Sequence, residues 1–225
     1  DLLADLGLSP RMTPLEETDD LMPALMRRFQ SAVQRDGALL EDYRRLALRH
    51  GRFQLGHWLE EALRRRTEIE LAARAGVLAD SVPPAADPHA VSGVRAAEFV
   101  AAAGELADAL ERQDKYKNLA QPAADGLNEA LLQTDDRAAY EQFRAALFTK
   151  DGHGTPRQRL GDRREQAVLC EALDAMREQI DQQDAHEDHA AMSRLSLVLF
   201  AEYAALKRQR GLVDMNDLER VAVAL

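Results

Sequence analysis

The sequence has little cysteine, few aromatic residues and no long apolar run. Its one cysteine, Cys170, cannot form a disulfide within the chain and is typical of a reducing compartment, so we expect a cytoplasmic protein. Aromatic residues make up 5% of the chain while Ala, Leu, Arg and Glu are abundant, which favours helices over sheets. No apolar run approaches the roughly 20 residues that a membrane-spanning helix needs, so we expect no contact with a membrane.

The sequence also lacks the common motifs of catalysis and cofactor binding. Neither a GxxxxGK[ST] loop nor a GxGxxG loop is present, so no segment is expected to cradle a nucleotide phosphate. His186 and His189 have a spacing that lets two histidines on a helix share a metal ion, but their segment is polar all round and offers no third ligand. Cys170 lies in an apolar stretch, which is typical of a core thiol rather than a nucleophile. We therefore expect no catalytic residue, metal ion or cofactor in this chain.

The charge balance is acidic, with 29 Lys and Arg residues against 39 Asp and Glu residues and a formal net charge of −10. This balance excludes a protein that binds nucleic acid with its whole surface, but it allows a local basic site. Residues 148–166 carry five basic and three acidic side chains, a net charge of +2. The basic residues are Lys150, Arg157, Arg159, Arg163 and Arg164.

These five side chains are the candidate DNA contacts, since Lys and Arg on a turn suit phosphate groups. The hydroxyls of Thr149 and Thr155 lie nearby in the sequence, and Phe148 is a candidate platform for base stacking. The alternative is a solvated loop whose arginines pair with carboxylates elsewhere in the chain.

Nearly every other segment has the apolar periodicity of an amphipathic helix. Helices are predicted at about 19–35, 38–49, 53–75, 87–113, 123–133, 135–147, 160–183 and 187–209. Trp58, with Phe53 and Leu55, is predicted to lie in the core. The pair Asp151-Gly152 predicts a tight turn between two short extended arms within residues 148–159. The predicted fold class is therefore all-α, an irregular multi-helix domain with one hairpin loop.

One segment interrupts this helical pattern as a linker. Residues 81–87 contain two prolines and small residues without periodicity. We expect one domain over residues 1–225, with sub-parts 1–80 and 87–225 joined by this segment.

The closing segment, residues 211–225, predicts the start of a capped helix. Asp214 is placed to accept the backbone N–H of Asp217, and Asp217 adds a favourable charge at the helix N-terminus. Val213 and Leu218 are expected to be buried beside this cap. The sequence begins without Met, and this helix runs to the last residue without a capping residue. We therefore expect the chain to be a piece of a larger protein whose chemistry lies outside it.

Three stretches resemble the UvrD/RecB/AddA group of superfamily 1 DNA helicases. Residues 203–218 are similar to the family signature Y…K…LDFxDL, with Val213 and Met215 as apolar replacements for its Leu and Phe. Residues 147–157, LFTKDGHGTPR, are similar to the FLTKDGxPRK segment of AddA-type proteins. Residues 2–20, which include LGLSPRM, look like the stretch that follows the family's TIHSFC motif. The order and spacing of the three stretches make the resemblance more specific than any one of them.

The resemblance implies that the chain is the helical insertion, domain 1B, between the Walker A and Walker B parts of a helicase motor. The parent would bind ATP and Mg, translocate on single-stranded DNA and unwind duplex in double-strand break repair and recombination. Its ATP site would lie outside this chain. In RecB- and AddA-type members an exonuclease domain follows, and a second helicase–nuclease subunit is a partner. Residues 212–225 would lead the chain back to the motor domains.

Within this interpretation the basic side chains of residues 150–164 are expected to face DNA at the single-strand/duplex junction. Lys207, Arg208 and Arg210 are weaker candidates, because they could instead seat the domain on the motor core. The alternative function is a structural or protein-interaction domain without direct DNA contact.

Overall fold

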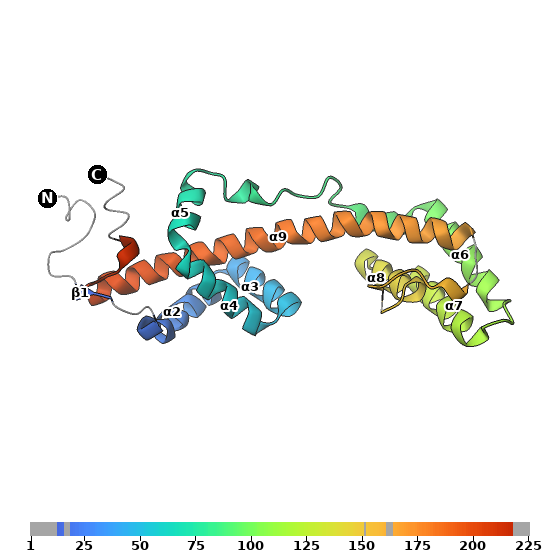
Figure 1. Ribbon diagram of the computed structural model, residues 1–225, viewed down its shortest axis with the longest axis horizontal. Helices are drawn as coiled ribbons and strands as arrows, with labels where there is room; N and C mark the ends of the chain where they lie inside the picture. The colour runs from blue at the N-terminus through green and yellow to red at the C-terminus, as the bar shows by residue number, and fades with distance from the viewer. Residues whose placement is uncertain (1–12, 16–18, 151, 161–163, 218–225) are drawn as a thin grey trace. The chain divides into compact units, whose positions relative to one another are not determined.

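The protein is mostly helical, as predicted. The computed structural model describes residues 13–15, 19–150, 152–160 and 164–217 (Figure 1). The α-helices are α2 (Met22–Arg35), α3 (Gly37–His50), α4 (Arg52–Arg64), α5 (Arg66–Arg74), α6 (Ala97–Glu111), α7 (Lys117–Leu132), α8 (Asp136–Leu147) and α9 (Arg164–Arg210). The short 3-10 helices are η1 (Asp19–Leu21), η2 (Ala79–Ser81), η3 (Ala90–Arg95) and η4 (Gln158–Leu160), and the strands are β1 (Thr13–Pro14) and β2 (Leu212–Val213).

The chain divides into two compact units. The first unit is Asp1–Pro83 together with His186–Leu225, and the second is Pro84–Ala185. The boundary after Pro83 falls inside the segment predicted as a linker. The sequence alone assigned all of 87–225 to one sub-part, whereas the structure groups residues 186–225 with the N-terminal unit. The reason is helix α9, whose first half belongs to the second unit and whose second half belongs to the first.

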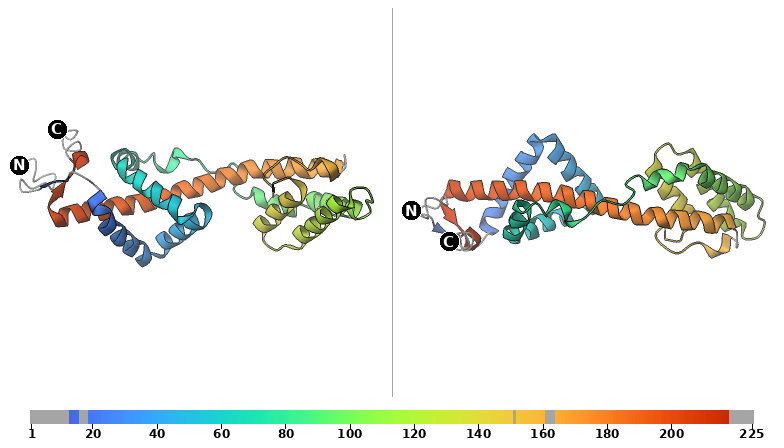
Figure 2. Two further views of the ribbon diagram at one scale, coloured as in Figure 1. Left: turned by 60° about the horizontal axis from the view of Figure 1, so that its bottom comes forward. Right: turned by 90° about the horizontal axis from the view of Figure 1, so that it is seen from above.

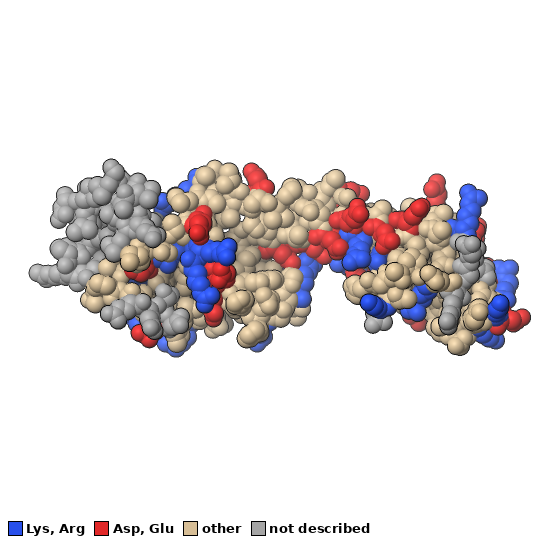
Figure 3. Space-filling model, viewed as in Figure 1, with Lys and Arg blue, Asp and Glu red and all other residues tan. Residues whose placement is uncertain are grey.

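Helix α9 is one continuous helix of 47 residues, so the prediction of two helices separated near residue 185 is wrong. The polar run from Asp184 to His189 suggested a turn, but α9 contains neither Gly nor Pro and nothing in its backbone ends the helix. The polar side chains have partners instead. The ring nitrogen Nδ1 of His186 donates to the carbonyl oxygen of Val82 at 2.7 Å, and Glu187 accepts a hydrogen bond from Arg45 at 3.0 Å. On the face shown in Figure 3, acidic and basic side chains often lie next to one another.

The first unit is built on the C-terminal half of α9. Helices α2, α3 and α4 place their apolar faces against it (Figures 1 and 2). The buried positions follow the helical period, as in Leu25, Phe29 and Val33 of α2. On α9 they include Leu195, Leu199, Phe200, Tyr203 and Leu206. This periodic burial fixes the C-terminal end of α9 within the first unit.

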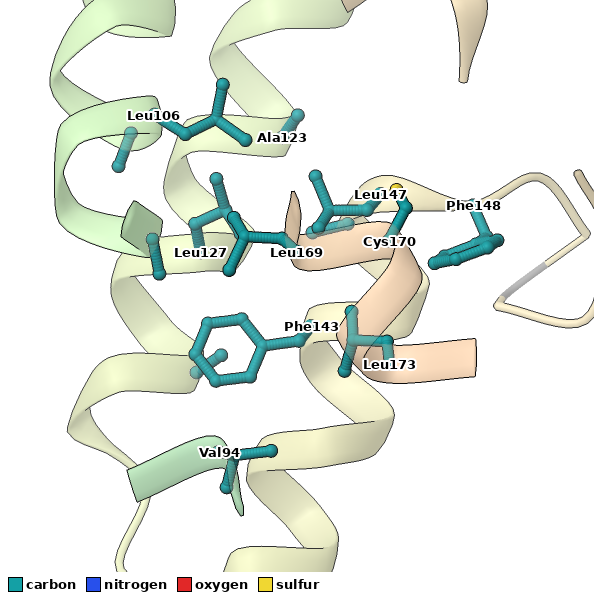
Figure 4. Packing of buried hydrophobic residues seen from close by; sticks show 14 of the residues in the cluster. Val94, Leu106, Ala123, Leu127, Phe143, Leu147, Phe148, Leu169, Cys170 and Leu173 are labelled. Carbon is teal, nitrogen blue, oxygen red and sulfur yellow. The ribbon is translucent and has the colours of Figure 1, made fainter. Parts of the chain in front are cut away.

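The second unit has its own core, formed by α6, α7, α8 and the N-terminal half of α9. Figure 4 shows Leu127, Phe143 and Leu169 pointing toward one another from three different helices. Phe99 packs edge-on against Phe143, with ring centroids 5.0 Å apart. The sulfur of Cys170 lies beside Leu147 in the same view, so the prediction of a core thiol is confirmed. Burial raises the pKa of this thiol to about 11, and Asp174 adds to the shift.

Helix boundaries differ from the predictions where a local signal was misread. The helix predicted at 53–75 is two helices, α4 and α5, separated at Arg65. Helix α7 begins at Lys117 rather than at 123, and Pro122 lies inside it. The helix predicted from residue 87 is a 3-10 segment, η3, followed by α6.

The two ends of the described chain lie side by side. Strands β1 and β2 pair in parallel, with Thr13 opposite Leu212 and Pro14 opposite Val213. Thr13 N–H donates to the carbonyl of Gly211, and Leu15 N–H to that of Val213, both at 2.8 Å. The first unit is therefore closed by hydrogen bonds between its N-terminal and C-terminal segments. None of the helices in the described ranges has the length and apolar character that a bilayer span requires.

Candidate functional site

The loop predicted to carry DNA contacts is a hydrogen-bonded hairpin. Phe148 and Pro156 form an antiparallel bridge. The Thr149 N–H donates to the carbonyl oxygen of Thr155 at 2.9 Å, and the Arg157 N–H donates to the carbonyl oxygen of Leu147 at 2.8 Å. The prediction of two short extended arms is thus confirmed for the described residues. Gly154 is required here, because a Cβ at this position would lie 2.0 Å from Oγ1 of Thr149.

Arg144 anchors this hairpin from helix α8, and the sequence reasoning missed it. Arg144 is buried, with only 3% of its surface exposed. Nε donates to the carbonyl of Gly152 at 2.9 Å, and Nη1 donates to Asp174 at 2.8 Å. The guanidinium carbon lies 4.1 Å from the ring centroid of Phe148. The available signal was the position of Arg144, four residues from both Tyr140 and Phe148 and therefore on the buried face of α8.

Phe148 is 1% exposed, and Arg144 stacks on its ring. The prediction that Phe148 offers a platform for base stacking is therefore wrong. Its apolar ring completes the core of the second unit instead, as Figure 4 shows.

The other candidate DNA contacts fall into three groups. Lys150 and Arg164 are exposed, Lys150 at the turn with a left-handed backbone (φ 51°) and Arg164 at the start of α9. Arg157 is half-buried and donates to the carbonyl of Ala145 at 3.3 Å, while its Nε is buried without a hydrogen-bond partner among the described residues. The side chain of Arg159 and the whole of Arg163 lie outside the described residues.

A hollow lies against the hairpin. Its volume is about 390 Å³, and it is lined by Leu119, Thr149, Thr155, Pro156, Arg157, Gln158 and Leu160. Both predicted hydroxyl groups and one predicted arginine therefore border the same hollow. This arrangement offers hydrogen-bond donors to an anionic group.

A second candidate site is a buried charge cluster near the C-terminus. Asp214 accepts hydrogen bonds from the Tyr203 hydroxyl at 2.9 Å, from Nζ of Lys207 at 2.8 Å and from the guanidinium of Arg66. Lys207 also donates to Asp217. The Lys207 ammonium and the Arg66 guanidinium lie 4.7 Å and 5.1 Å from the Tyr203 ring centroid. The cluster holds two cations and two carboxylates within a well-packed region.

Asp214 and Asp217 cap the segment that follows β2, as predicted. Asp217 N–H donates to Oδ1 of Asp214, and Asp214 N–H donates to Oδ2 of Asp217, both at 3.1 Å. Burial alone would raise the pKa of Asp214, but Lys207, Arg66 and Tyr203 outweigh it and hold the pKa below its usual value. The carboxylate is therefore charged over the whole neutral range.

The other candidate residues near the C-terminal end of α9 differ in their exposure to solvent. Lys207, a weaker candidate for DNA contact, is 4% exposed and donates to Asp214 and Asp217, so its ammonium group is not presented to solvent. Arg208 and Arg210 are exposed. Val213 is half-buried in β2, and Leu218 lies outside the described residues.

The histidines considered as metal ligands serve the backbone of the segment before the second unit. Nε2 of His189 lies 2.7 Å from the carbonyl oxygen of Leu78, and Ser81 Oγ lies 2.8 Å from the same nitrogen. Across the described residues no group of three His, Cys, Asp or Glu side chains is arranged to hold a metal ion.

No protein-family profile, curated protein or solved structure matches this chain.

Proposed function

We propose that the chain is a DNA-facing insertion domain of an ATP-dependent DNA helicase of the UvrD/RecB/AddA type. In this proposal the motor domains of the parent bind ATP and Mg and do the chemical work, while this domain holds DNA near the junction of single strand and duplex. The parent acts in double-strand break repair, with a second helicase–nuclease subunit as a partner. The chain itself contributes contacts and positioning, not catalysis.

The observation that carries the proposal is the buried cluster around Asp214. Tyr203, Lys207 and Asp214 are the residues on which the resemblance of the closing stretch depends, and they meet in one hydrogen-bonded group. Tyr203 and Lys207 lie one helical turn apart on α9, and Asp214 reaches both from the residue after β2. The cluster gives the three residues a common task, which is to fix the direction in which the chain leaves helix α9.

The pairing of β1 with β2 also supports an insertion. An inserted domain leaves its host and returns to it at one place, so its first and last segments must lie close together. Thr13–Pro14 and Leu212–Val213 meet this requirement, since they form a parallel pair. The first unit is the part that would face the host.

The hairpin supports the DNA-facing part of the proposal. It corresponds to the stretch that resembles the AddA-type segment, and it presents the exposed Lys150 beside the hollow that Arg157 and the two threonines line. A lysine ammonium, a guanidinium and hydroxyls are the usual donors to phosphate oxygens.

The test measures binding of the full 225-residue chain to forked DNA over a range of salt concentrations. Reversing charge in the double variant Lys150→Glu, Arg164→Glu should weaken binding and reduce the slope of log affinity against log salt by about 0.9 for each lost phosphate contact. Both side chains are exposed, so the fold should tolerate the change. The matched control is Arg112→Glu, an exposed arginine of the same unit that pairs with Asp108 four residues earlier. Equal affinities and slopes for all three proteins would reject the DNA-facing role.

The second candidate is a structural or protein-interaction domain, and the ion pairs favour it. Many arginines are engaged within the chain, among them Arg28 with Glu202, Arg45 with Glu187, Arg95 with Asp136, and Arg194 with Asp42. Basic side chains used in this way serve the fold and leave less charge for DNA. Under this alternative the double variant Lys150→Glu, Arg164→Glu, which we call the hairpin variant, would bind forked DNA as the unchanged protein does.

A further inference from the structure

The turn between α3 and α4 is the most basic stretch of this acidic chain. Residues 43–59 contain four arginines and two histidines and no Asp or Glu, whereas the whole chain has a net charge of −10. We call residues 44–57 the α3–α4 turn. Gly51 shapes it, since its φ of +85° ends α3 and starts α4 in a conformation that side chains with a Cβ rarely adopt.

Two large apolar side chains of this turn are exposed to solvent. Phe53 is 90% exposed and Leu48 is 88% exposed, although Phe53 was predicted to lie in the core. The prediction is wrong because Leu55 and Leu59 occupy the buried face of α4, and Phe53 lies on the opposite side of the first turn. Single exposed apolar side chains are common on soluble proteins, so Phe53 gains significance only together with the basic side chains of the same turn.

The charges of the α3–α4 turn are partly uncompensated. Arg45 and Arg49 pair with Glu187 and Asp188 of α9, and these pairs hold the turn against the helix. Arg44 and Arg52 are exposed, and among the described residues neither has an ion-pair partner. Two free guanidinium groups therefore belong to the same turn as an exposed aromatic ring.

We propose that the α3–α4 turn binds an unpaired nucleic-acid strand, with Phe53 stacked on a base and Arg44 and Arg52 on the flanking phosphates. The inference rests on the proposed function, and it assigns a contact separate from the hairpin of the second unit. An exposed ring needs an accessible base face, which a single strand offers and a duplex conceals. The positive charge of the turn complements the phosphate backbone. An acidic protein would account for the arginines but not for the exposed aromatic ring of the same turn.

Trp58 provides a direct signal for this contact. It is the only tryptophan of the chain, and its ring lies edge-on to His50 of the turn, with centroids 4.8 Å apart. Binding of oligothymidylate at the turn should change the Trp58 fluorescence. The probe is an oligothymidylate of about 16 nucleotides, the upper end of common single-strand site sizes, together with an abasic phosphate strand of equal length.

The decisive variant is Phe53→Leu, which keeps an apolar side chain and removes the ring. It should weaken binding of oligothymidylate at least about fivefold, in line with the loss of one base–aromatic stack, and leave binding of the abasic strand unchanged. Phe53→Tyr keeps the ring and should bind as the unchanged protein does. Because Phe53 is 90% exposed, thermal unfolding of both variants should match that of the unchanged protein.

The arginines are tested by the double variant Arg44→Gln, Arg52→Gln. Its slope of log affinity against log salt should fall by about 1.4, since each phosphate contact to a single strand contributes about 0.7. The matched control is Arg64→Gln, Arg65→Gln, which removes the same charge from exposed residues on the other end of α4. This control should leave the slope unchanged.

Three results would overturn the inference. Unchanged oligothymidylate binding by Phe53→Leu would reject the stacking of a base on Phe53. If the hairpin variant Lys150→Glu, Arg164→Glu still weakens binding of forked DNA, the proposed function stands without this contact. Competition by polyglutamate as effective as that by oligothymidylate would identify an acidic protein as the partner instead. Failure of the unchanged chain to bind any of the DNA probes would overturn this inference and the proposed function together.

Discussion

Lys207 Nζ lies 2.8 Å from Oδ2 of Asp214, and both side chains are at least nine-tenths removed from solvent. Arg66 faces the other carboxylate oxygen, and Asp217 accepts a second hydrogen bond from Lys207. Each of the four charges thus has an opposite partner within the cluster. A buried charge is tolerable only under this condition, because its desolvation cost must be offset locally.

Removing one cation from this cluster should be costly. Lys207→Met retains the stem of the side chain but leaves Asp214 and Asp217 without the ammonium group. We expect the free energy of unfolding to fall by about 3 kcal/mol, the lower end for breaking a buried pair, because Arg66 still faces Asp214. Urea unfolding followed by circular dichroism would measure the change. Arg208→Met is the control, since Arg208 is the exposed neighbour and should change stability little. A similar small effect at Lys207 would mean that the pair contributes no net stability.

The same cluster predicts a dependence of stability on pH. The pKa of Asp214 is lowered in the folded protein, because its cationic and hydroxyl partners outweigh the effect of burial. A carboxyl with a lowered folded pKa stabilises the fold above its unfolded pKa of about 3.9, and this contribution disappears as pH falls through the folded value. The difference in unfolding free energy between the unchanged protein and Asp214→Asn should therefore be largest at neutral pH.

Denaturant unfolding at several pH values between about 6 and 2.5 would test this, since the window brackets the unfolded pKa. The difference between the two proteins should begin to shrink near pH 4 and continue to shrink below it. Exposed Asp135→Asn offers a comparison at a helix cap outside the cluster. A difference that stays constant down to the lowest pH would show that the Asp214 carboxylate is not preferentially stabilised in the folded state.

Some contacts of the Asp214 cluster follow from spacing along the sequence, and others depend on the tertiary fold. The cap formed by Asp214 and Asp217 could be predicted, because both partners lie three residues apart and the pattern is local. Tyr203 and Lys207 lie four apart on one helix face, which is again a local relation. Arg66 could not be predicted, since 148 residues separate it from Asp214 and only the packing of α5 brings it there.

Helix α9 and Arg144 show the complementary limit. A run of polar residues at 184–189 was interpreted as a turn, because sequence alone does not reveal that Val82, Arg45 and other distant groups satisfy it. The role of Arg144 does not follow from the sequence, because a single arginine on an apolar helix face usually extends to solvent. Its partners are the carbonyl of Gly152 and the carboxylate of Asp174, and their direction depends on the tertiary fold.

Arg144 should control the order of the hairpin. In Arg144→Met the apolar contact with Phe148 is kept, while the donors to Gly152 and Asp174 are lost. Asp174 is 55% exposed at its side chain and stays hydrated, so no buried charge is stranded. We expect a loss of about 1 to 3 kcal/mol in the stability of the hairpin, because the buried carbonyl of Gly152 loses its donor.

Limited digestion with trypsin would report this change, because Lys150 lies at the exposed turn of the hairpin. Cleavage after Lys150, followed by mass spectrometry, should be faster in Arg144→Met than in the unchanged protein. Arg112→Met, an exposed change on the same unit, should leave the rate unaltered. Equal rates in all three proteins would mean that the backbone pairing alone holds the hairpin.

The same hairpin requires the backbone of Gly154 to pack closely against Thr149. An alanine Cβ there would lie 2.0 Å from Oγ1 of Thr149 and 2.8 Å from its carbonyl oxygen, both too close for carbon–oxygen contact. Gly154→Ala should therefore lower stability by about 1 to 3 kcal/mol, as overpacking does. Gly104→Ala is the matched control, because a Cβ in the middle of α6 meets nothing within 4 Å. There the better helix propensity of alanine should raise stability by about 0.5 to 1 kcal/mol.

The double variant Gly154→Ala, Thr149→Ala separates the two contacts. Removing the Thr149 hydroxyl relieves the approach of 2.0 Å but leaves the backbone carbonyl at 2.8 Å, so stability should recover only in part. Thr149→Ala alone should cost little, because its hydroxyl donates one exposed hydrogen bond of 3.2 Å to Thr155. Thermal unfolding of the four proteins gives the coupling between the two positions. Complete recovery in the double variant would place the whole conflict in the side chain, whereas no recovery would place it in the backbone, where no substitution at residue 149 can relieve it.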